Sequence, residues 1–400
     1  MKKRYFAAAA VLACLSLTAC ESPTNAGTNS GAQTEKEAQG VTQNQILIGS
    51  SGPLTGPVAP YGAINEGANA YFNYINAKGG VNGRKIKFIM LDDQYLPEKA
   101  AANAKQLAAD KVFATVSTVG TASSEAMDPI LQKANIPITG ISSGSSILSS
   151  PVETGRYAYP PTYTMEGHAV VKFAAVQNHV KTLGVFYQND DFGKEELAAI
   201  SSEAKKDGVK IVAEIPYNVT DTDYSTYALN MKAKNPDAVF EAAVPGPAAQ
   251  FMKGIAELNW HPEQYLSFTS ADPSMFKLAG SAFNHVYVTF WQPQLDSPKT
   301  KDFVAEFKKD YPNQEPTLNG LEGWAEAQIL VHALEACGNN ITVANFDKQM
   351  DSISNWTGAA SASPITYSPT DHDGIHSLYL VQADTKTKTF KQITGMLTNN

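Results

Sequence analysis

The sequence predicts an α/β protein with two lobes, each built on a doubly wound parallel sheet. Short apolar runs that suit buried strands alternate with longer segments whose apolar residues recur at helical spacing. Short turns separate these segments, and such alternation favours parallel strands joined by helices. From residue 44 onward the chain offers about 350 residues, more than one hydrophobic core holds comfortably, so two lobes are expected.

Residues 46–93 contain the clearest strand, helix and strand unit. The apolar strand Ile46–Ile48 leads into a loop rich in glycine and proline that presents Tyr61. A helix with an apolar stripe follows, and a basic residue and then Gly79 supply its stop signal. The next strand, Ile86–Leu91, is a nearly unbroken apolar run, as expected when helices cover both faces of a sheet. It ends at two aspartates, on the sheet edge where ligands of such folds bind.

The same alternation continues through two further stretches of the chain. Pro97 opens an alanine-rich helix, and Gly208 ends another. The expected helices are residues 97–110, 164–179 and 194–207, and the expected strands are residues 112–116, 136–139, 183–187, 209–215 and 238–242. Both stretches therefore predict α/β units of the same kind.

The N-terminus has the pattern of an export signal. Three basic residues precede an apolar run from Tyr5 to Leu17, which fits a signal peptide rather than a membrane span. Leu17, Thr18, Ala19 and Cys20 complete a lipobox, in which the Cys20 thiol carries the lipid; a plain secretory signal is the alternative. We therefore predict a lipoprotein signal peptide over residues 1–19 and a flexible polar tether over residues 20–43.

Charge and cysteine content narrow the function further. The whole chain has a formal net charge of −8, and loss of the three positive charges in residues 1–19 brings this value to −11. An acidic body argues against nucleic acid or an anionic membrane surface as a partner. Cys14 leaves with the signal and Cys20 is acylated, so Cys337 remains as a small core hydrophobe and no intramolecular disulfide can form.

Five segments in order resemble one family. They are GPLTGPVAPYG with INAKGGVNGRKI and LDD, then VSTVGTASSEA, YQNDDFG, GLEGWAEAQILVHALEACG and YSPTDHDG. Together they resemble the type I periplasmic solute-binding proteins, the leucine/isoleucine/valine-binding family, over residues 44–395. The resemblance implies two doubly wound parallel-sheet lobes joined by three crossover strands.

The resemblance also implies that each lobe is discontinuous. The expected crossings lie near Tyr163, residues 290–292 and residues 367–370. The first lobe then comprises residues 44–163 with 291–368, and the second comprises residues 164–290 with 369–397. A helix capped by Ser297 and the helix over residues 320–336 return to the first lobe, and strands 378–381 and 390–393 complete the second.

Two serine- and threonine-rich loops are expected to bind the ligand at the carboxyl ends of strands, where helix N-termini attract anions. In the first loop, residues 117–124, the resemblance implies that Thr121 and backbone groups near Gly120 hold a carboxylate. In the second loop, residues 141–146, Ser142 and Ser143 would add donors. Ordinary helix capping by these residues is the alternative.

The expected walls of the pocket are aromatic. Tyr61 from the first lobe and Phe192 from the second are the predicted walls, with a core role as the alternative for Phe192.

Family members that bind branched-chain amino acids use an acidic second-lobe side chain for the ammonium group. The matching residues 268–271 have none, and Asp272 is nearest. We therefore expect ligand choice to depart from leucine, isoleucine and valine.

The predicted function is that of a lipid-anchored, extracytoplasmic substrate-binding component of an ABC importer, whose partners are the permease and ATPase subunits. Its ligand would be a small carboxylate-bearing solute, an amino acid or a related organic acid. A ligand sensor for a receptor is one alternative. A serine hydrolase is another, because residues 140–144 form G-x-S-x-G with Ser142 as nucleophile and Asp371 and His372 follow. No enzyme activity, cofactor or metal is expected, and the histidines and aspartates of residues 371–376 suit a solvated turn.

Overall fold

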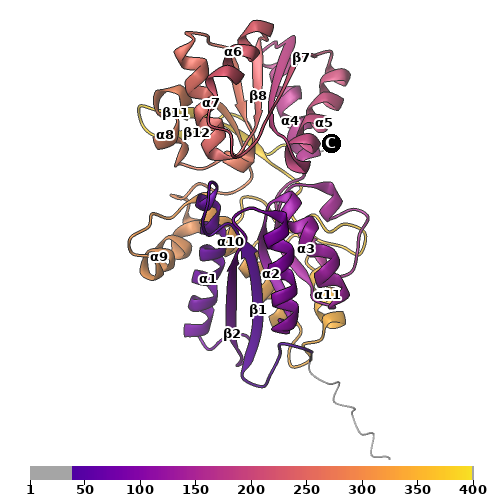
Figure 1. Cartoon of the computed structure of the whole chain (residues 1–400). Coiled ribbons are helices and arrows are strands. Elements are labelled where there is room, and N and C mark those ends of the chain that lie inside the picture. Colours follow the sequence, from indigo (N-terminus) through magenta and orange to yellow (C-terminus); the bar gives the residue numbers. More distant parts are fainter. Residues whose placement is uncertain (1–37, 399–400) are drawn as a thin grey trace, which may run out of the picture. The chain divides into compact units, whose positions relative to one another are not determined.

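Two parallel-dominated sheets, each flanked by helices, form the body of the protein (Figure 1). The structure is a computed structural model, and it describes residues 38–398. The predicted signal peptide, Cys20 and most of the predicted tether lie outside the described residues. Two parallel-dominated α/β sheets with alternating helices are present, so the expected fold class is confirmed.

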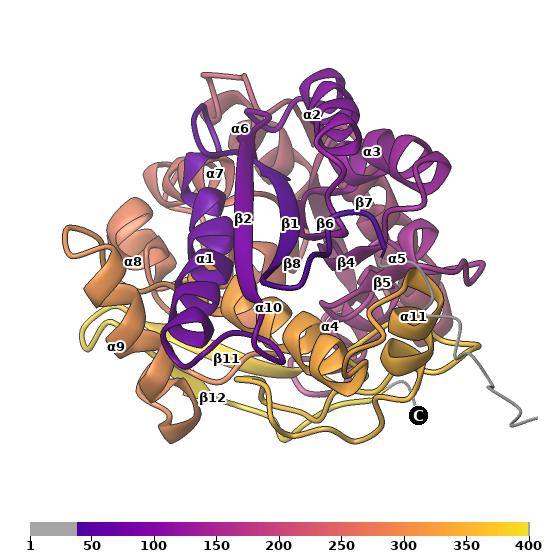
Figure 2. The ribbon, with the colours of Figure 1, turned by 90° about the horizontal axis from the view of Figure 1, so that it is seen from below.

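The first lobe contains a five-stranded parallel sheet in the order β2-β1-β3-β4-β5. Helix α1 lies on one side of this sheet, and α2 and α3 lie on the other (Figures 1 and 2). The strands are β1 (Gln45–Gly52), β2 (Lys85–Asp92), β3 (Ala114–Val119), β4 (Ile138–Ser142) and β5 (Arg156–Ala158). The helices are α1 (Gly62–Ala77), α2 (Pro97–Ala109), α3 (Thr121–Lys133), α9 (Lys301–Asp310), α10 (Leu318–Ala336) and α11 (Val343–Asp351).

The second lobe contains a seven-stranded sheet in the order β12-β11-β10-β9-β8-β6-β7. Its strands are β6 (Thr182–Gln188), β7 (Lys210–Tyr217), β8 (Ala238–Ala242), β9 (Glu263–Leu266), β10 (Tyr287–Phe290), β11 (Tyr379–Asp384) and β12 (Thr389–Gln392). Its helices are α4 (Tyr163–Val176), α5 (Asp191–Asp207), α6 (Ser225–Lys234), α7 (Pro245–Glu257) and the short α8 (Met275–Leu278).

Two details of the sheets differ from the prediction. Strand β11 pairs antiparallel with both β10 and β12, and for β12 the reason is the short turn after β11, which allows a hairpin but no crossover helix. Strand β2 was expected to be covered on both faces, but it is the edge strand of its sheet and most of its residues are partly exposed. An apolar run therefore did not distinguish an edge strand from a central one.

The chain changes sheet between β5 and α4, between β10 and α9, and before β11. At the third change Asp373 still forms a parallel bridge with Ala158 of the first lobe, beyond the crossing expected near residues 367–370. The residue boundaries of the two lobes remain a prediction.

The predicted helix signals act as expected. Ser297 caps a short 3-10 turn, Pro298–Thr300, which precedes α9, and Gly208 ends α5 in the left-handed conformation. One cap was missed: the side chain of Thr317 accepts a hydrogen bond from Gly320 N at 3.1 Å, so α10 begins at Leu318 and not at residue 320. These local signals set where each helix begins and ends.

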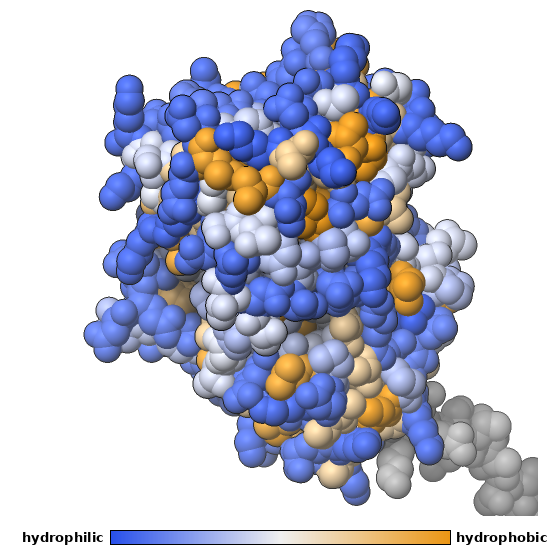
Figure 3. All heavy atoms as spheres, turned by 45° about the horizontal axis from the view of Figure 1, so that its top comes forward, coloured by the Kyte–Doolittle hydropathy of each residue, from blue (hydrophilic) through white to orange (hydrophobic). Residues whose placement is uncertain are grey.

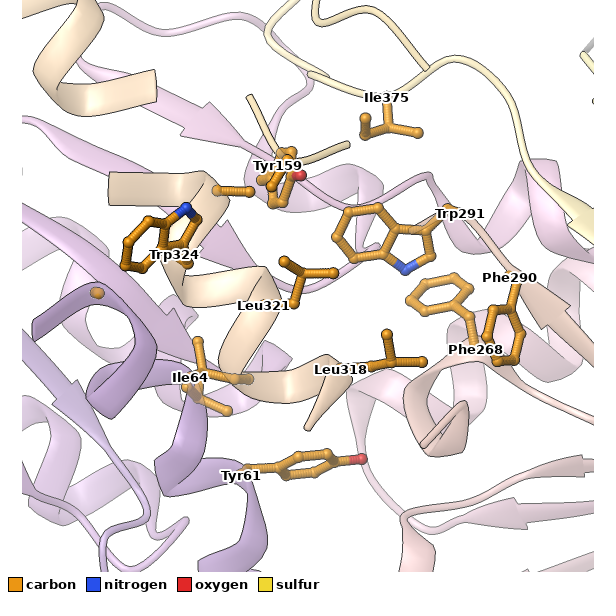
Figure 4. Close-up of a cluster of buried hydrophobic side chains, with 14 of the residues drawn as sticks. Tyr61, Ile64, Tyr159, Phe268, Phe290, Trp291, Leu318, Leu321, Trp324 and Ile375 are labelled. Carbon is orange, nitrogen blue, oxygen red and sulfur yellow. The ribbon is translucent and has the colours of Figure 1, made fainter. Parts of the chain in front are cut away.

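Helices α1 and α10 pack backbone to backbone. A Cβ atom added at Gly323 would lie 1.7 Å from the Ile64 carbonyl oxygen, and one at Gly67 would lie 1.8 Å from the Gly320 carbonyl oxygen. Near this contact, Trp324 packs edge-on against Tyr71, with ring centroids 4.9 Å apart. Figure 4 shows the apolar side chains that α1 and α10 bring together here. The close crossing holds the first two turns of α10 in a fixed position.

On the face shown in Figure 3, hydrophilic residues dominate and apolar residues gather in small groups. Cys337 is a free, buried thiol, as expected for a core residue. Within residues 38–398, no helix combines the length and the apolar character that a membrane span requires.

Candidate ligand-binding site

A pocket lies at the carboxyl ends of the parallel strands, with walls from both lobes. It measures about 50 Å³, less than the roughly 150 Å³ cavity that admits benzene in another protein, so an amino acid enters only if the walls move apart. The lining residues are Tyr61, Ile64, Tyr95, Val119, Gly120, Ser142, Ser143, Pro160, Tyr163, Phe192, Val244, Phe268, Thr269, Ala271, Trp291, Gln292, Asn319 and Glu322.

The first-lobe wall is formed where β3 meets α3. Gly120 is the N-cap residue of α3, and its φ of 91° lies in the region that favours glycine. A Cβ atom there would lie 2.5 Å from the Tyr95 ring, so a side chain at this position would also displace a wall of the pocket. The first N–H groups of a helix have no intrahelical partners, and they make the N-terminus of α3 a possible anion site.

Thr121 lies behind this wall and does not line the pocket. Its hydroxyl is 2.8 Å from Ser143 Oγ and 3.4 Å from the Tyr163 hydroxyl, and the residue is 1% exposed. The loop predicted over residues 117–124 is in fact the end of β3, Gly120 and the first turn of α3. Thr121 therefore supports Ser143, which does line the pocket.

The two predicted aromatic walls both line the pocket. The Tyr61 hydroxyl donates to the Thr269 carbonyl oxygen at 2.6 Å and so connects the lobes. Burial raises the pKa of Tyr61 well above its usual value, which keeps this hydroxyl protonated. Phe192 packs against Tyr163, with ring centroids 5.3 Å apart. Sequence reasoning missed four further aromatic lining residues: Tyr95, Tyr163, Phe268 and Trp291.

Asp272, the expected partner of an ammonium group, lies outside the pocket lining. One carboxylate oxygen accepts a hydrogen bond from Leu318 N at 2.9 Å, and the other accepts one from Ser274 N at 2.8 Å. The side chain thus satisfies an N–H group at the start of α10 in the other lobe. The sequence could not show the contact between Asp272 and Leu318, because the two residues lie 46 positions apart along the chain.

Glu322 is the acidic side chain of the pocket, and sequence reasoning missed it. Ser142 on β4 donates its hydroxyl hydrogen to the Glu322 carboxylate. Burial raises the pKa of Glu322 to about 7. Glu326, one turn further along α10, accepts a hydrogen bond from Ser117 Oγ at 2.6 Å. A signal was present in the sequence, since two glutamates four residues apart on a mostly apolar helix share one face.

The hydrolase arrangement is not formed. The Ser142 hydroxyl donates to Glu322, whereas the ring nitrogens of His372 lie 2.8 Å from the Arg156 carbonyl oxygen and 3.1 Å from Asp351 Oδ1. Ser142 therefore has no histidine base among the residues that line the pocket. In the described part of the chain, no three His, Cys, Asp or Glu side chains are grouped so that they could hold a metal ion.

The model of the periplasmic binding protein family matches residues 45–388. The chain belongs to this family. A relative of this periplasmic binding protein, the leucine-, isoleucine-, valine-, threonine- and alanine-binding protein of Pseudomonas aeruginosa, is 22% identical over 295 residues, which cover 73% of this chain and 79% of that protein.

Solved structures share the fold of this periplasmic binding protein. A branched-chain amino acid ABC transporter protein from Thermus thermophilus with bound valine has a TM-score of 0.81 at 19% identity, covering 90% of this chain and 98% of that one. A fatty acid ABC transporter substrate-binding protein from Thermomonospora curvata has a TM-score of 0.83 at 21% identity, covering 91% and 95%. These similarities establish the common fold.

Proposed function

We propose that this protein is the lipid-anchored substrate-binding component of an ABC importer and that it closes its lobes over one small carboxylate-bearing solute. The observation that carries the proposal is the pocket at the carboxyl ends of the strands, which has walls from both lobes. Its relatives support the ligand class, because one is named for binding five amino acids and one structure contains valine.

Three hydrogen-bonded contacts between the lobes support a closing mechanism. Glu195 on α5 accepts hydrogen bonds from Ser145 Oγ at 2.5 Å and from the N–H and hydroxyl of Ser146, both at 2.7 Å. The other two contacts are Tyr61 with Thr269 and Asp272 with Leu318. All three join residues of different lobes, so they form only when the lobes meet and they favour a closed state around the ligand.

The carboxylate of the ligand binds at the N-terminus of α3. This end of the helix faces the pocket through Gly120, with Ser143 beside it. Backbone N–H groups and the helix dipole both favour a negative charge there. The apolar part of the ligand then contacts the aromatic walls, which exclude water and lose little rotamer entropy on binding.

Thermal-shift screening of amino acids, organic acids and neutral polar compounds tests the ligand class. A ligand that binds only the native state adds about 2.7 kcal/mol to the free energy of unfolding when its free concentration is a hundred times its Kd. The melting temperature of the protein then rises clearly. We expect carboxylates to raise the melting temperature. A rise with neutral polar compounds alone would disprove the anion site at α3.

Anchoring and transport need separate tests. Replacement of Cys20 by serine should abolish metabolic labelling with palmitate and leave ligand binding unchanged, because Cys20 precedes the folded body. Equal labelling of both proteins would contradict the lipid anchor.

Deletion of the protein should abolish uptake of the solute that it binds, and unchanged uptake would instead favour a sensor that reports to a receptor.

A further inference from the structure

The charge of the pocket restricts what it can bind. Of the described residues that line it, none is lysine, arginine or histidine, and Glu322 is the one carboxylate. An anion could still bind at the N-terminus of α3, but it would lie near a carboxylate with no basic side chain to neutralise it. A ligand with both a negative and a positive group suits this pocket better than a plain anion.

The glutamate lies beside the anion site. Ser142 connects the two, because its hydroxyl donates to Glu322 and its carbonyl oxygen accepts a hydrogen bond from Gly120 N at 3.2 Å. In the sheet, Ser142 is the register partner of Val119, the residue before Gly120. Ser142 is therefore hydrogen-bonded both to Glu322 and to Gly120 at the start of α3. An α-amino acid carries its ammonium and carboxylate groups on one carbon atom, which matches this arrangement.

We propose that Glu322 holds the α-ammonium group of an amino acid whose carboxylate lies at the N-terminus of α3. This inference rests on the proposed function and names its substrate class: zwitterionic amino acids with an apolar or aromatic side chain, in preference to plain carboxylic acids. The ammonium partner then comes from the first lobe. The second-lobe stretch, residues 268–271, has no acid, and both oxygens of Asp272 accept other hydrogen bonds.

The surroundings of Glu322 agree with this role. The titratable groups that face it are Glu326 on its own helix, Tyr61 at the start of α1 and Tyr159 after β5, and none of these carries a positive charge. Burial raises the pKa of Glu322 to about 7, so the group is ready to ionise when a cation arrives. An ammonium group would lower this pKa and offset the cost of burying the carboxylate.

The test compares amino acids with their deaminated analogues by calorimetry. The probes are leucine with 4-methylpentanoate, and phenylalanine with 3-phenylpropanoate. We expect the wild type to bind at least one amino acid about 30-fold or more tightly than its analogue, and Glu322→Gln to reduce this ratio below about 3-fold. Glu326→Gln is the matched control, since Glu326 is buried on the same helix but does not line the pocket, and the ratio should persist.

Each other outcome has a defined meaning. An amino acid that binds no more tightly than its analogue, or a ratio that survives Glu322→Gln, would overturn the role of Glu322 and leave the proposed function intact. Binding of none of the four probes would overturn the proposed amino acid or organic acid ligand as well.

Proton release gives a second readout that uses the wild-type protein and does not depend on how well the variant folds. Because burial raises the pKa of Glu322 to about 7, part of the population carries its proton at pH 7, and binding of leucine or phenylalanine should release that proton. Calorimetry in two buffers with different ionisation enthalpies measures the number of protons released. Absence of proton release by the wild type would contradict the proposal, as would equal release by Glu322→Gln.

Discussion

The two walls of the pocket differ in chemistry. The first-lobe wall carries the polar side chains of Ser142, Ser143 and Glu322 and the start of α3 at Gly120, beside Tyr61 and other apolar residues. The second-lobe wall is mostly apolar and includes Phe192, Val244, Phe268 and Ala271. We infer that the first lobe recognises the polar groups of the ligand and that the second lobe covers its apolar part on closing.

The second lobe does contain carboxylates, but they are used elsewhere. Glu166 and Glu196 are buried behind the wall, and Ser267 Oγ lies 3.0 Å and 2.7 Å from their carboxylate oxygens. Glu195 and Asp272 accept hydrogen bonds from the first lobe. Acidic residues in the second lobe therefore stabilise the lobe itself or its closed position. The comparison teaches that the number of acids near a cleft does not show which lobe binds the ligand.

The largest expected effect tests how the first-lobe wall is held in place. Replacement of Gly323 by alanine should destabilise the protein by about 3 kcal/mol or more, because the new Cβ would lie 1.7 Å from the Ile64 carbonyl oxygen and force α10 away from α1. Urea unfolding measures the change. Gly246→Ala in α7 is the control, since no atom lies within 4 Å of the added Cβ, and it should change stability by less than about 1 kcal/mol. Equal effects of the two substitutions would contradict the close packing.

A second prediction compares one hydroxyl from each wall. Ser142→Ala removes the donor to Glu322, and loss of a hydrogen bond to a charged group should weaken amino acid binding by about 1.5 to 3 kcal/mol. Thr269→Val should weaken it by less than about 0.7 kcal/mol, because the Thr269 hydroxyl is directed to Ser267 Oγ at 3.1 Å and Ala243 O at 3.3 Å and not to Glu322. Titration calorimetry with leucine and phenylalanine gives both values. A larger loss in the Thr269 variant would place polar recognition in the second lobe.

A third prediction separates closure from recognition. Asp272→Ala leaves the Leu318 N–H without its partner in the other lobe, so leucine and 4-methylpentanoate should both bind about tenfold less tightly, a loss of about 1.4 kcal/mol. The ratio between the two ligands should stay constant, as measured by calorimetry. If leucine alone lost affinity, Asp272 would be the ammonium partner after all.

The last expected effect is a pH dependence of stability in both lobes. Burial, and then the charge of Glu166, raises the pKa of Glu196 well above its usual value, and burial raises that of Glu322 to about 7. A carboxyl group whose pKa is higher in the folded than in the unfolded protein stabilises the folded state while it is protonated. This contribution to the free energy of unfolding is complete below about pH 4.5 and is lost as the pH rises, for Glu322 through about 7. The melting temperature of the ligand-free protein should therefore fall by a few degrees between pH 5 and pH 8. Glu322→Gln and Glu196→Gln should each flatten this profile, and a profile unchanged by both would refute the assignment.

Much of the fold follows from local sequence signals. Pro97, Gly208 and Ser297 mark helix ends through interactions with residues within a few positions, so a single sequence is enough to read them. The apolar periodicity likewise predicted the alternating strands and helices, and the length of the chain predicted two lobes. Of the expected site residues, Tyr61, Gly120, Ser142, Ser143 and Phe192 line the pocket, because they follow the carboxyl ends of strands or begin the next helix. Their contact with a ligand remains a prediction.

The sequence alone therefore determined the class of fold and the region of the pocket, whereas only the tertiary structure decided which acid lines the pocket. Glu322 meets Ser142 across 180 residues, and Asp272 meets Leu318 across 46. Neither pairing leaves a local pattern, because it depends on how α10 crosses α1 and where the second lobe closes. The edge position of β2 and the antiparallel β11 have the same origin: helix and strand periods are set by neighbouring residues, but partners are set by packing of distant segments.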